Sequence, residues 1–275
     1  MTKKDSGHWW REHFEESPAH RSVSQVQAQI DGVEKLLNLE PRSRVLDIGC
    51  GSGGRTLELA RRVQRVLGID SLEASLWQAR QAAREDRLSV HFVKSDIRQL
   101  AYRDEFDAVV NFGTAFGRFT SDRDDLRMLE SVRKSLKSEG KFLIDLLNKE
   151  WLMRHFEPNF GEQGRQEKRG SVVLEQITYN LEAGRLENRR TFIGKDGSRV
   201  VTFVSLRVYT LTEIKSLIER AGLVYRQVWG GFDGSAYGMD SARMIVLAVK
   251  PHEARAPRKA DENLVRAIRI KGRRK

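Results

Sequence analysis

The sequence predicts an α/β protein with a doubly wound, seven-stranded sheet and an antiparallel β insertion. From about residue 22, short apolar runs alternate with longer stretches of helical periodicity, which is typical of βαβ units and a parallel sheet. After residue 150, β-rich stretches follow one another across Gly-containing turns, which is typical of antiparallel hairpins. A chain of 275 residues accommodates one main domain with short appendages.

Hydrophobic periodicity and turn residues predict the individual elements. Apolar residues recur at helical spacing over 22–38 and stop before Pro41, so a helix leads into the first strand. In the first half, the sequence then predicts strand 44–48, helix 53–62, strand 66–69, helix 72–84, strands 89–94 and 106–111, helix 126–136 and strand 141–147. In the second half it predicts antiparallel strands 172–179, 186–193 and 199–209, a helix capped by Thr212 and ended by Gly222, and strands 223–229 and 242–249.

Composition narrows the class of protein. The longest strongly apolar stretch, 244–249, is far too short to span a bilayer, and no apolar segment of a secretory signal follows the N-terminus. We therefore expect a soluble, cytoplasmic protein without membrane insertion. The one cysteine, Cys50, excludes an internal disulfide, and the six histidines show no metal-ligand spacing, so we expect no bound metal.

The C-terminal segment 251–275 is strongly basic. It holds nine Lys and Arg residues against three acidic ones and so carries +6 of the formal net charge of +11. Its composition favours disorder in its first half and a basic amphipathic end that would bind nucleic acid or another acidic surface. A solvated tail that only adds solubility is the simpler interpretation, because charge runs alone are weak indicators of a partner.

The segment 45–54, Val-Leu-Asp-Ile-Gly-Cys-Gly-Ser-Gly-Gly, places glycines where the first strand stops and a helix begins. Without Cβ atoms the backbone can turn sharply and a ligand can approach it closely. The spacing Gly49-x-Gly51-x-x-Gly54 also fits the dinucleotide fingerprint, which is a weak signal alone. Asp47 argues against a dinucleotide, because a carboxylate at this position repels a diphosphate. It suits instead a ligand that carries a sulfonium and an α-amino group.

Two further carboxylates follow the next two strands. Asp70 ends the second strand, where it can accept hydrogen bonds from a ribose diol. Asp96 follows the third strand and can accept one from an adenine amino group, while Ile97 and the residues after Asp70, beginning with Ser71, enclose the ring. The carboxyl ends of parallel strands share one edge of a sheet, so these carboxylates are expected in one crevice.

These motifs together resemble those of class I S-adenosylmethionine-dependent methyltransferases. The Asp-x-Gly-x-Gly-x-Gly pattern at 47–53 is similar to that family's first motif, Asp70 to its ribose acid, and Asp96-Ile97 to its adenine motif. The late antiparallel strand pair matches as well, and the resemblance covers about residues 22–250. It implies a Rossmann-like sheet, S-adenosyl-L-methionine as cofactor, and methyl transfer as the activity.

The resemblance also implies roles for single residues. Gly49, Gly51 and Gly53 would line the methionine and ribose part of the cofactor site, and Asn111, at the end of the fourth strand, would lie near the transferred methyl. The competing interpretation is a doubly wound domain whose glycines serve packing alone.

The class of methyl acceptor follows mainly from exclusions, because direct displacement from a sulfonium needs alignment more than a universal catalytic residue. Residues 111–114 lack the Asn/Asp-Pro-Pro-Tyr/Phe motif that characterises base and glutamine N-methyltransferases. Methylation of pyrimidine C5 uses a cysteine nucleophile, and the only cysteine lies in the cofactor loop. The segment 111–119 instead resembles small-molecule methyltransferases, including sugar N,N-dimethyltransferases, and this favours transfer to N or O of a small molecule.

Those small-molecule enzymes also carry an N-terminal helical lid and an insertion, so we expect a lid over 1–40, a methyltransferase domain over 41–250 with an insertion at about 151–210, and the tail 251–275. Aromatic residues of the lid could close over substrate. Candidate acceptor-site residues are Trp10, Phe14, Arg207 and Tyr209, and the candidate general bases are His13 and His155.

Each of these candidates has a simpler structural interpretation: a helix docked by its aromatics, a salt-bridged sheet face, or a surface histidine.

At the level of function, three alternatives also stay open. They are an RNA or protein methyltransferase that captures its substrate through the basic tail, a non-catalytic module that keeps the fold, and a nicotinamide-dependent dehydrogenase. The sequence does not indicate the oligomeric state.

Overall fold

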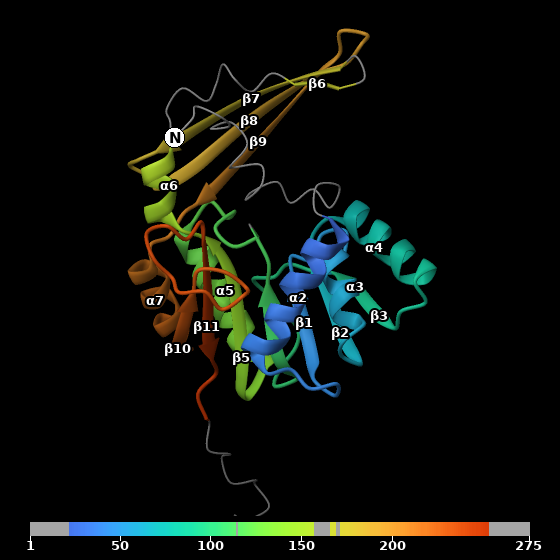
Figure 1. Cartoon of the computed structure of the whole chain (residues 1–275), viewed down its shortest axis with the longest axis vertical. Coiled ribbons are helices and arrows are strands. Elements are labelled where there is room, and N and C mark those ends of the chain that lie inside the picture. Colours follow the sequence, from blue (N-terminus) through green and yellow to red (C-terminus); the bar gives the residue numbers. More distant parts are fainter. Residues whose placement is uncertain (1–21, 114, 157–165, 169–170, 253–275) are drawn as a thin grey trace, which may run out of the picture.

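The computed structural model describes residues 22–113, 115–156, 166–168 and 171–252. Its main sheet has seven strands. The five central and right-hand strands in Figure 1 are parallel, and the other two are antiparallel to their neighbours. The predicted fold class is therefore confirmed. In spatial order the strands are β10 (Val224–Trp229), β11 (Arg243–Val249), β5 (Leu136–Leu147), β4 (Phe106–Asn111), β1 (Arg44–Ile48), β2 (Arg65–Asp70) and β3 (Val90–Lys94).

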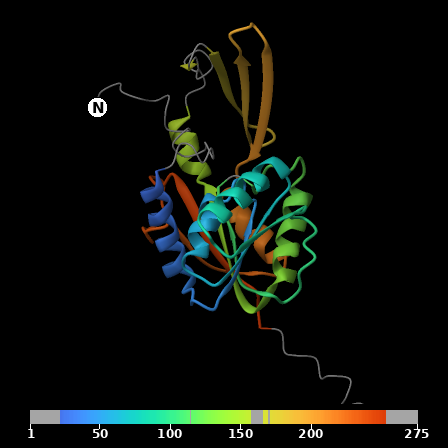
Figure 2. The same ribbon diagram turned by 90° about the vertical axis from the view of Figure 1, so that its right-hand side faces the viewer.

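Helices cover both faces of this sheet (Figure 2). Successive strand residues point to opposite faces, so Val45 of β1 packs with Ile30, whereas its neighbour Leu46 packs with Met128 and Ile218. None of the helices in the described part of the chain has the length and apolar character of a membrane-spanning segment. One face carries α2 (Val23–Leu37) and α3 (Gly54–Ala60), with α4 (Glu73–Glu85) beside α3, and the other carries α5 (Asp122–Ser135) and α7 (Leu211–Arg220).

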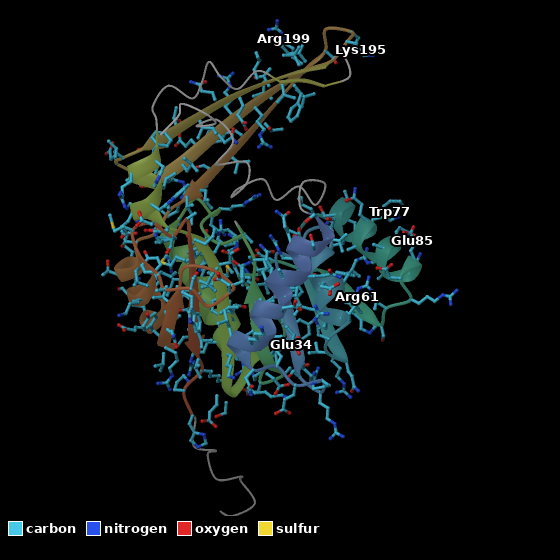
Figure 3. The ribbon with its side chains drawn as sticks, in the orientation of Figure 1. Glu34, Arg61, Trp77, Glu85, Lys195 and Arg199 are labelled. Atoms are coloured by element: carbon cyan, nitrogen blue, oxygen red, sulfur yellow. The ribbon has the colours of Figure 1, made fainter. Side chains whose placement is uncertain are left out.

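The antiparallel insertion predicted between the fifth strand and the next helix is confirmed. It follows α6 (Lys149–His155) and projects beyond the carboxyl ends of the parallel strands (Figure 1). Lys195 and Arg199 mark its tip, far from the main sheet (Figure 3), whereas Trp77 lies on the outer side of α4. Its strands, in spatial order, are β6 (Gln166–Lys168), β7 (Ser171–Asn180), β8 (Arg185–Ile193) and β9 (Arg199–Arg207).

Helix boundaries account for most of the differences from the predicted elements. Helix α5 begins four residues earlier than expected, because the Ser121 hydroxyl caps it by accepting from the Arg123 amide at 3.1 Å. Thr210, and not Thr212, caps α7, since Thr210 and Glu213 form a reciprocal capping box. Helix α6 was not predicted, and its cap is Asn148, which accepts from two amides of the first turn.

Helix α2 falls within the range 1–40 that was predicted to form a lid. Its residues Ile30, Val33 and Leu37 are buried in the core, whereas Val26 near its start lines the cavity described below. Residues 22–40 are thus part of the main domain, and residues 1–21 lie outside the described residues. A lid formed by that earlier segment stays a prediction.

Candidate active site

A cavity of about 1030 Å³ opens at the carboxyl ends of the parallel strands, on the edge predicted to bind the cofactor. Strand order reverses between β1 and β4, and the crevice beside such a switch point is the usual ligand site of open α/β sheets. The cavity continues to the inner face of the insertion, so residues far apart in sequence line its two halves. Its volume reaches the upper end of the range of about 300–1,000 Å³ that is typical of ligand sites.

The loop after β1 lines one half of this cavity. Gly51 has a φ of +56°, and a Cβ added there would have no neighbouring atom within 4 Å. A side chain at this position would thus be strained and would point into the space that a ligand needs. Gly49 also lines the cavity, as predicted.

Two other predicted cofactor residues lie behind the cavity wall. Gly53 is a packing position, because a Cβ there would lie 2.8 Å from the Ala79 Cβ and 2.9 Å from the Phe92 ring. Asn111 is fully buried, and its Nδ2 donates to the carbonyl of Ile48 at 2.6 Å. Both residues support the loop from behind, and their predicted direct contact with the cofactor stays a prediction.

Asp47 reaches the cavity only from its floor. Its side chain is 1% exposed, and its Oδ2 accepts a hydrogen bond from the Thr56 hydroxyl at 2.6 Å. Thr56 lies in the first turn of α3, so this bond connects the end of β1 to the helix that follows the glycine loop. The carboxylate therefore fixes the shape of the loop and adds negative charge beneath it.

Asp70 holds the same loop from the neighbouring strand. Its Oδ2 accepts from the Gly51 amide at 2.9 Å and its Oδ1 from the Leu72 amide at 2.9 Å. Asp70 and Ser71 both line the cavity. A carboxylate has about four lone-pair directions, so Asp70 keeps capacity for the hydroxyl groups of a ribose.

Asp96 and Ile97 line the next part of the wall, after β3. Both oxygens of Asp96 accept from Arg98, at 2.6 to 3.0 Å, and these hydrogen bonds hold the pKa of that carboxyl below its usual range. Arg98 also contacts Asp124 at 3.3 Å and lies 4.9 Å above the Phe119 ring. This end of the cavity thus presents a carboxylate that stays ionised and can accept an amino N–H.

Sequence comparison agrees with this arrangement. Residues 45–140 match the family model described as a methyltransferase domain. This part of the chain is a methyltransferase domain, and the predicted resemblance to class I S-adenosylmethionine-dependent methyltransferases is confirmed. It is also 22% identical over 254 residues to a putative methyltransferase of Geobacillus sp. (strain WCH70), an alignment that covers 91% of this chain and all of that protein.

Solved structures of methyltransferases share the fold. An S-adenosylmethionine-dependent methyltransferase of Clostridium acetobutylicum superposes with a TM-score of 0.72 at 17% identity, over 85% of this chain and 94% of that one. The amino pentose methyltransferase CalS10 of Micromonospora echinaspora, solved with S-adenosylmethionine bound, superposes with a TM-score of 0.61 at 20% identity, over 84% and 93%.

The cofactor of this methyltransferase is S-adenosylmethionine, and the cavity fits it. The open space beside Gly51 leaves room against the loop backbone, and carboxylates from two adjacent strand ends, Asp70 and Asp96, face the same space. These are the groups that a ribose diol and an adenine amino group require. When bound, the cofactor supplies an electrophilic methyl group on a sulfonium.

Cys50 lies in the loop, where its surroundings disfavour a thiolate. Burial, together with the charges of Asp47 and Asp70, raises the pKa of its thiol well above the usual range. This environment opposes the thiolate that pyrimidine C5 chemistry needs.

The insertion forms the other half of the cavity with the inner face of its strands. Sequence reasoning did not single out these residues as a site, although period-two alternation along β8 places Leu186, Asn188 and Arg190 on one face. The ion pair of Arg190 with Glu175, which is 5% exposed, lies at the polar end of this face. The cavity-lining residues from the insertion are Ile177, Leu186, Asn188, Arg190, Val204 and Leu206.

Arg207 and Tyr209, predicted to bind substrate, do not line the cavity. Arg207 donates to Glu213 at 2.7 Å and is 14% exposed, while the Tyr209 hydroxyl donates to Asp125 at 2.6 Å. Both side chains thus join the base of the insertion to α5 and α7. The geometry gives no support to their predicted substrate contacts.

Of the two candidate general bases the structure describes only His155, which does not line the cavity. His155 is exposed at the end of α6, stacked on the Trp151 ring at 4.4 Å. His13, Trp10 and Phe14 lie outside the described residues, so their predicted roles stay predictions. In the described ranges, no cluster of three or more His, Cys, Asp or Glu side chains has the geometry of a metal site.

Proposed function

We propose that this methyltransferase transfers the methyl group to a nitrogen or oxygen atom of a small molecule by direct displacement. The observation that carries the proposal is the apolar roof of the cavity, where Ile177, Leu186 and Leu206 of the insertion are each at most 6% exposed. A roof above the cofactor half leaves a compartment for a small acceptor, whereas an RNA or protein substrate needs an open surface. The roof also helps exclude water from the reacting atoms.

Cofactor binding in this proposal uses residues of three strand ends. Asp70 holds the ribose diol, Asp96 the adenine amino group beside Ile97, and the backbone at Gly49 and Gly51 lies against the methionine part. Asp47 acts through the loop that it braces. The residues align the acceptor at about 3 to 3.5 Å from the methyl carbon, which is the main requirement of a displacement.

Of nitrogen and oxygen, nitrogen is the acceptor atom that suits this cavity better. Among the described residues that line the cavity there is no histidine, and its carboxylates, Asp47, Asp70 and Asp96, lie on the cofactor side. A neutral amine attacks through its lone pair and needs no base beforehand, whereas an alcohol is a poor nucleophile until it loses a proton. The amino pentose methyltransferase with the same fold is consistent with this choice.

The test is S-adenosylhomocysteine release with four separate acceptor sets: small apolar amines, small phenols and alcohols, total RNA, and denatured protein. The proposal expects turnover with a member of the amine or hydroxyl set and none above background with RNA or protein. Turnover confined to RNA or protein, lost on deletion of residues 251–275, would replace it with the alternative of capture by the basic tail. The cytoplasmic location of the protein also stays a prediction.

A further inference from the structure

Asn188 is a single amide in an apolar part of the cavity roof. It lies on β8, with Ile177 of β7 and Val204 of β9 directly opposite it on the two neighbouring strands. All three side chains line the cavity, as do Leu186 and Leu206 one step closer to the main domain. The amide of Asn188 therefore lies among apolar side chains, and Arg190, the other polar residue of the roof, is ion-paired with Glu175.

The orientation of this amide is fixed by its neighbours. Nδ2 of Asn188 donates to Oε1 of Glu175 at 2.8 Å, and the same carboxylate is ion-paired with Arg190. A carboxylate held by a guanidinium can only accept hydrogen bonds, so the nitrogen of the amide must face Glu175. The carbonyl oxygen of Asn188 consequently points away from Glu175.

That carbonyl oxygen has no hydrogen-bond partner in the structure, although it is buried. A buried polar atom without a partner costs about 1–3 kcal/mol, and such atoms are uncommon in folded proteins. A cavity-lining residue whose acceptor atom is unpaired in the free protein can pair it with a ligand. The partner must be a hydrogen-bond donor, because an amide oxygen only accepts.

We propose that Asn188 selects the methyl acceptor by accepting a hydrogen bond from an N–H or O–H group on an otherwise apolar molecule. The inference deepens the proposed function and rests on it. The amide oxygen is not basic enough to remove a proton, so Asn188 binds and orients the acceptor. The apolar body of the molecule packs against Ile177, Val204 and Leu206, which are the apolar neighbours of Asn188 in the roof.

The test compares binding of matched compounds in the presence of S-adenosylhomocysteine, measured by ligand-observed NMR. The probes are 4-propylaniline and 4-propylphenol, each paired with its fully methylated counterpart, N,N-dimethyl-4-propylaniline or 4-propylanisole. In the wild type we expect each donor compound to bind about tenfold more tightly than its methylated counterpart. Asn188→Leu should reduce this ratio to below twofold.

Asn188→Gln is the control, because it keeps an amide that can donate to Glu175 and accept from a ligand, and it should retain a preference for donor compounds. S-adenosylhomocysteine affinity, measured by calorimetry, should be the same in all three proteins, which shows that each variant is folded. An unchanged ratio in Asn188→Leu, or a wild type that binds neither compound or both equally, overturns the inference. Failure of the wild type to bind S-adenosylhomocysteine would instead overturn the proposed function.

Discussion

The backbone amide of Gly51 donates a hydrogen bond to the carboxylate of Asp70 across 2.9 Å. This bond joins the glycine loop after β1 to the end of β2, so the two motifs recognised separately in the sequence form one rigid structure. The Leu72 amide donates to the other oxygen of the same carboxylate, also at 2.9 Å. The cofactor half of the cavity is therefore preorganised before any ligand binds.

Replacing Gly51 with alanine should weaken S-adenosylhomocysteine binding by at least about tenfold, because the added methyl group is strained at positive φ and enters the ligand space. Gly197→Ala is the matched control. Gly197 also has a positive φ, +78°, and open space around its Cβ position, but it lies in the turn between β8 and β9, away from the cavity. Calorimetry should show normal affinity for Gly197→Ala; equal losses in both variants would contradict a role for Gly51 at the ligand.

Asp70→Asn should lower the affinity for S-adenosylhomocysteine by about tenfold to a hundredfold. The amide has one acceptor oxygen in place of two, so it cannot hold both the Gly51 and Leu72 amides and also accept from a ribose. Asp240→Asn, at an aspartate whose side chain is 92% exposed, should leave the affinity unchanged. A Kd of Asp70→Asn within twofold of wild type would remove Asp70 from the cofactor site.

Most of the fold could be predicted because local signals agree with the tertiary structure. The parallel strands are short apolar runs, and the bounds of β1 and β4 are those that the pattern indicates. Helix ends were less predictable, because neighbouring residues compete for the cap. The prediction of Thr212 overlooked the Thr-x-x-Glu spacing of a capping box at Thr210 and Glu213, and the reciprocal bonds between these two residues identify Thr210 as the cap.

The site was predictable on its cofactor side and not on its acceptor side. Motif spacing located Asp70 and Asp96, which line the cavity. Nothing in the sequence indicates that the face of β8 bearing Asn188 folds back over the carboxyl ends of the parallel strands. Arg207 was a reasonable choice from its charge, but its partner Glu213 comes from a different element, and long-range pairs of this kind are not visible in a single sequence.

Asp125 should make stability depend on pH. Burial raises its pKa to about 6, although hydrogen bonds from Tyr209 and Gly117 lower it. Between the unfolded value of 3.8 and about 6, the folded chain keeps a proton that the unfolded chain loses. This contribution is therefore complete below pH 3.8 and is lost as the pH rises through about 6.

Urea unfolding of the wild type and of Asp125→Asn from pH 4 to pH 7 tests whether Asp125 makes stability depend on pH. The free energy of unfolding of the wild type should fall, relative to that of the variant, by up to about 3 kcal/mol over this range. Asp240→Asn should follow the wild type at every pH. A constant difference between the wild type and Asp125→Asn would mean that Asp125 titrates normally.

Arg207→Ala should destabilise the fold by about 1–3 kcal/mol, because it removes the hydrogen-bonded charged partner of Glu213 and leaves only the longer contact with Lys149 at 3.6 Å. The Thr210 amide and the Arg207 guanidinium together hold the pKa of Glu213 at about 2 despite burial. The stabilisation by the ionised Glu213 is therefore present above pH 4.5 and declines as the pH falls towards 2. Thermal unfolding at pH 7 should show the loss, whereas the exposed Arg189→Ala should change stability by less than about 0.5 kcal/mol. A raised acceptor KM in Arg207→Ala with unchanged stability would restore Arg207 as a substrate ligand.

Isothermal titration of the full chain with S-adenosylmethionine, S-adenosylhomocysteine and NAD tests the central claim most directly. The glycine loop, Asp70 and Asp96 predict micromolar or tighter binding of both S-adenosyl compounds and no detectable binding of NAD, since the carboxylate of Asp47 beneath the loop disfavours a diphosphate. Binding of NAD in preference to S-adenosylmethionine, or no binding of either S-adenosyl compound, would contradict the assignment of this cavity.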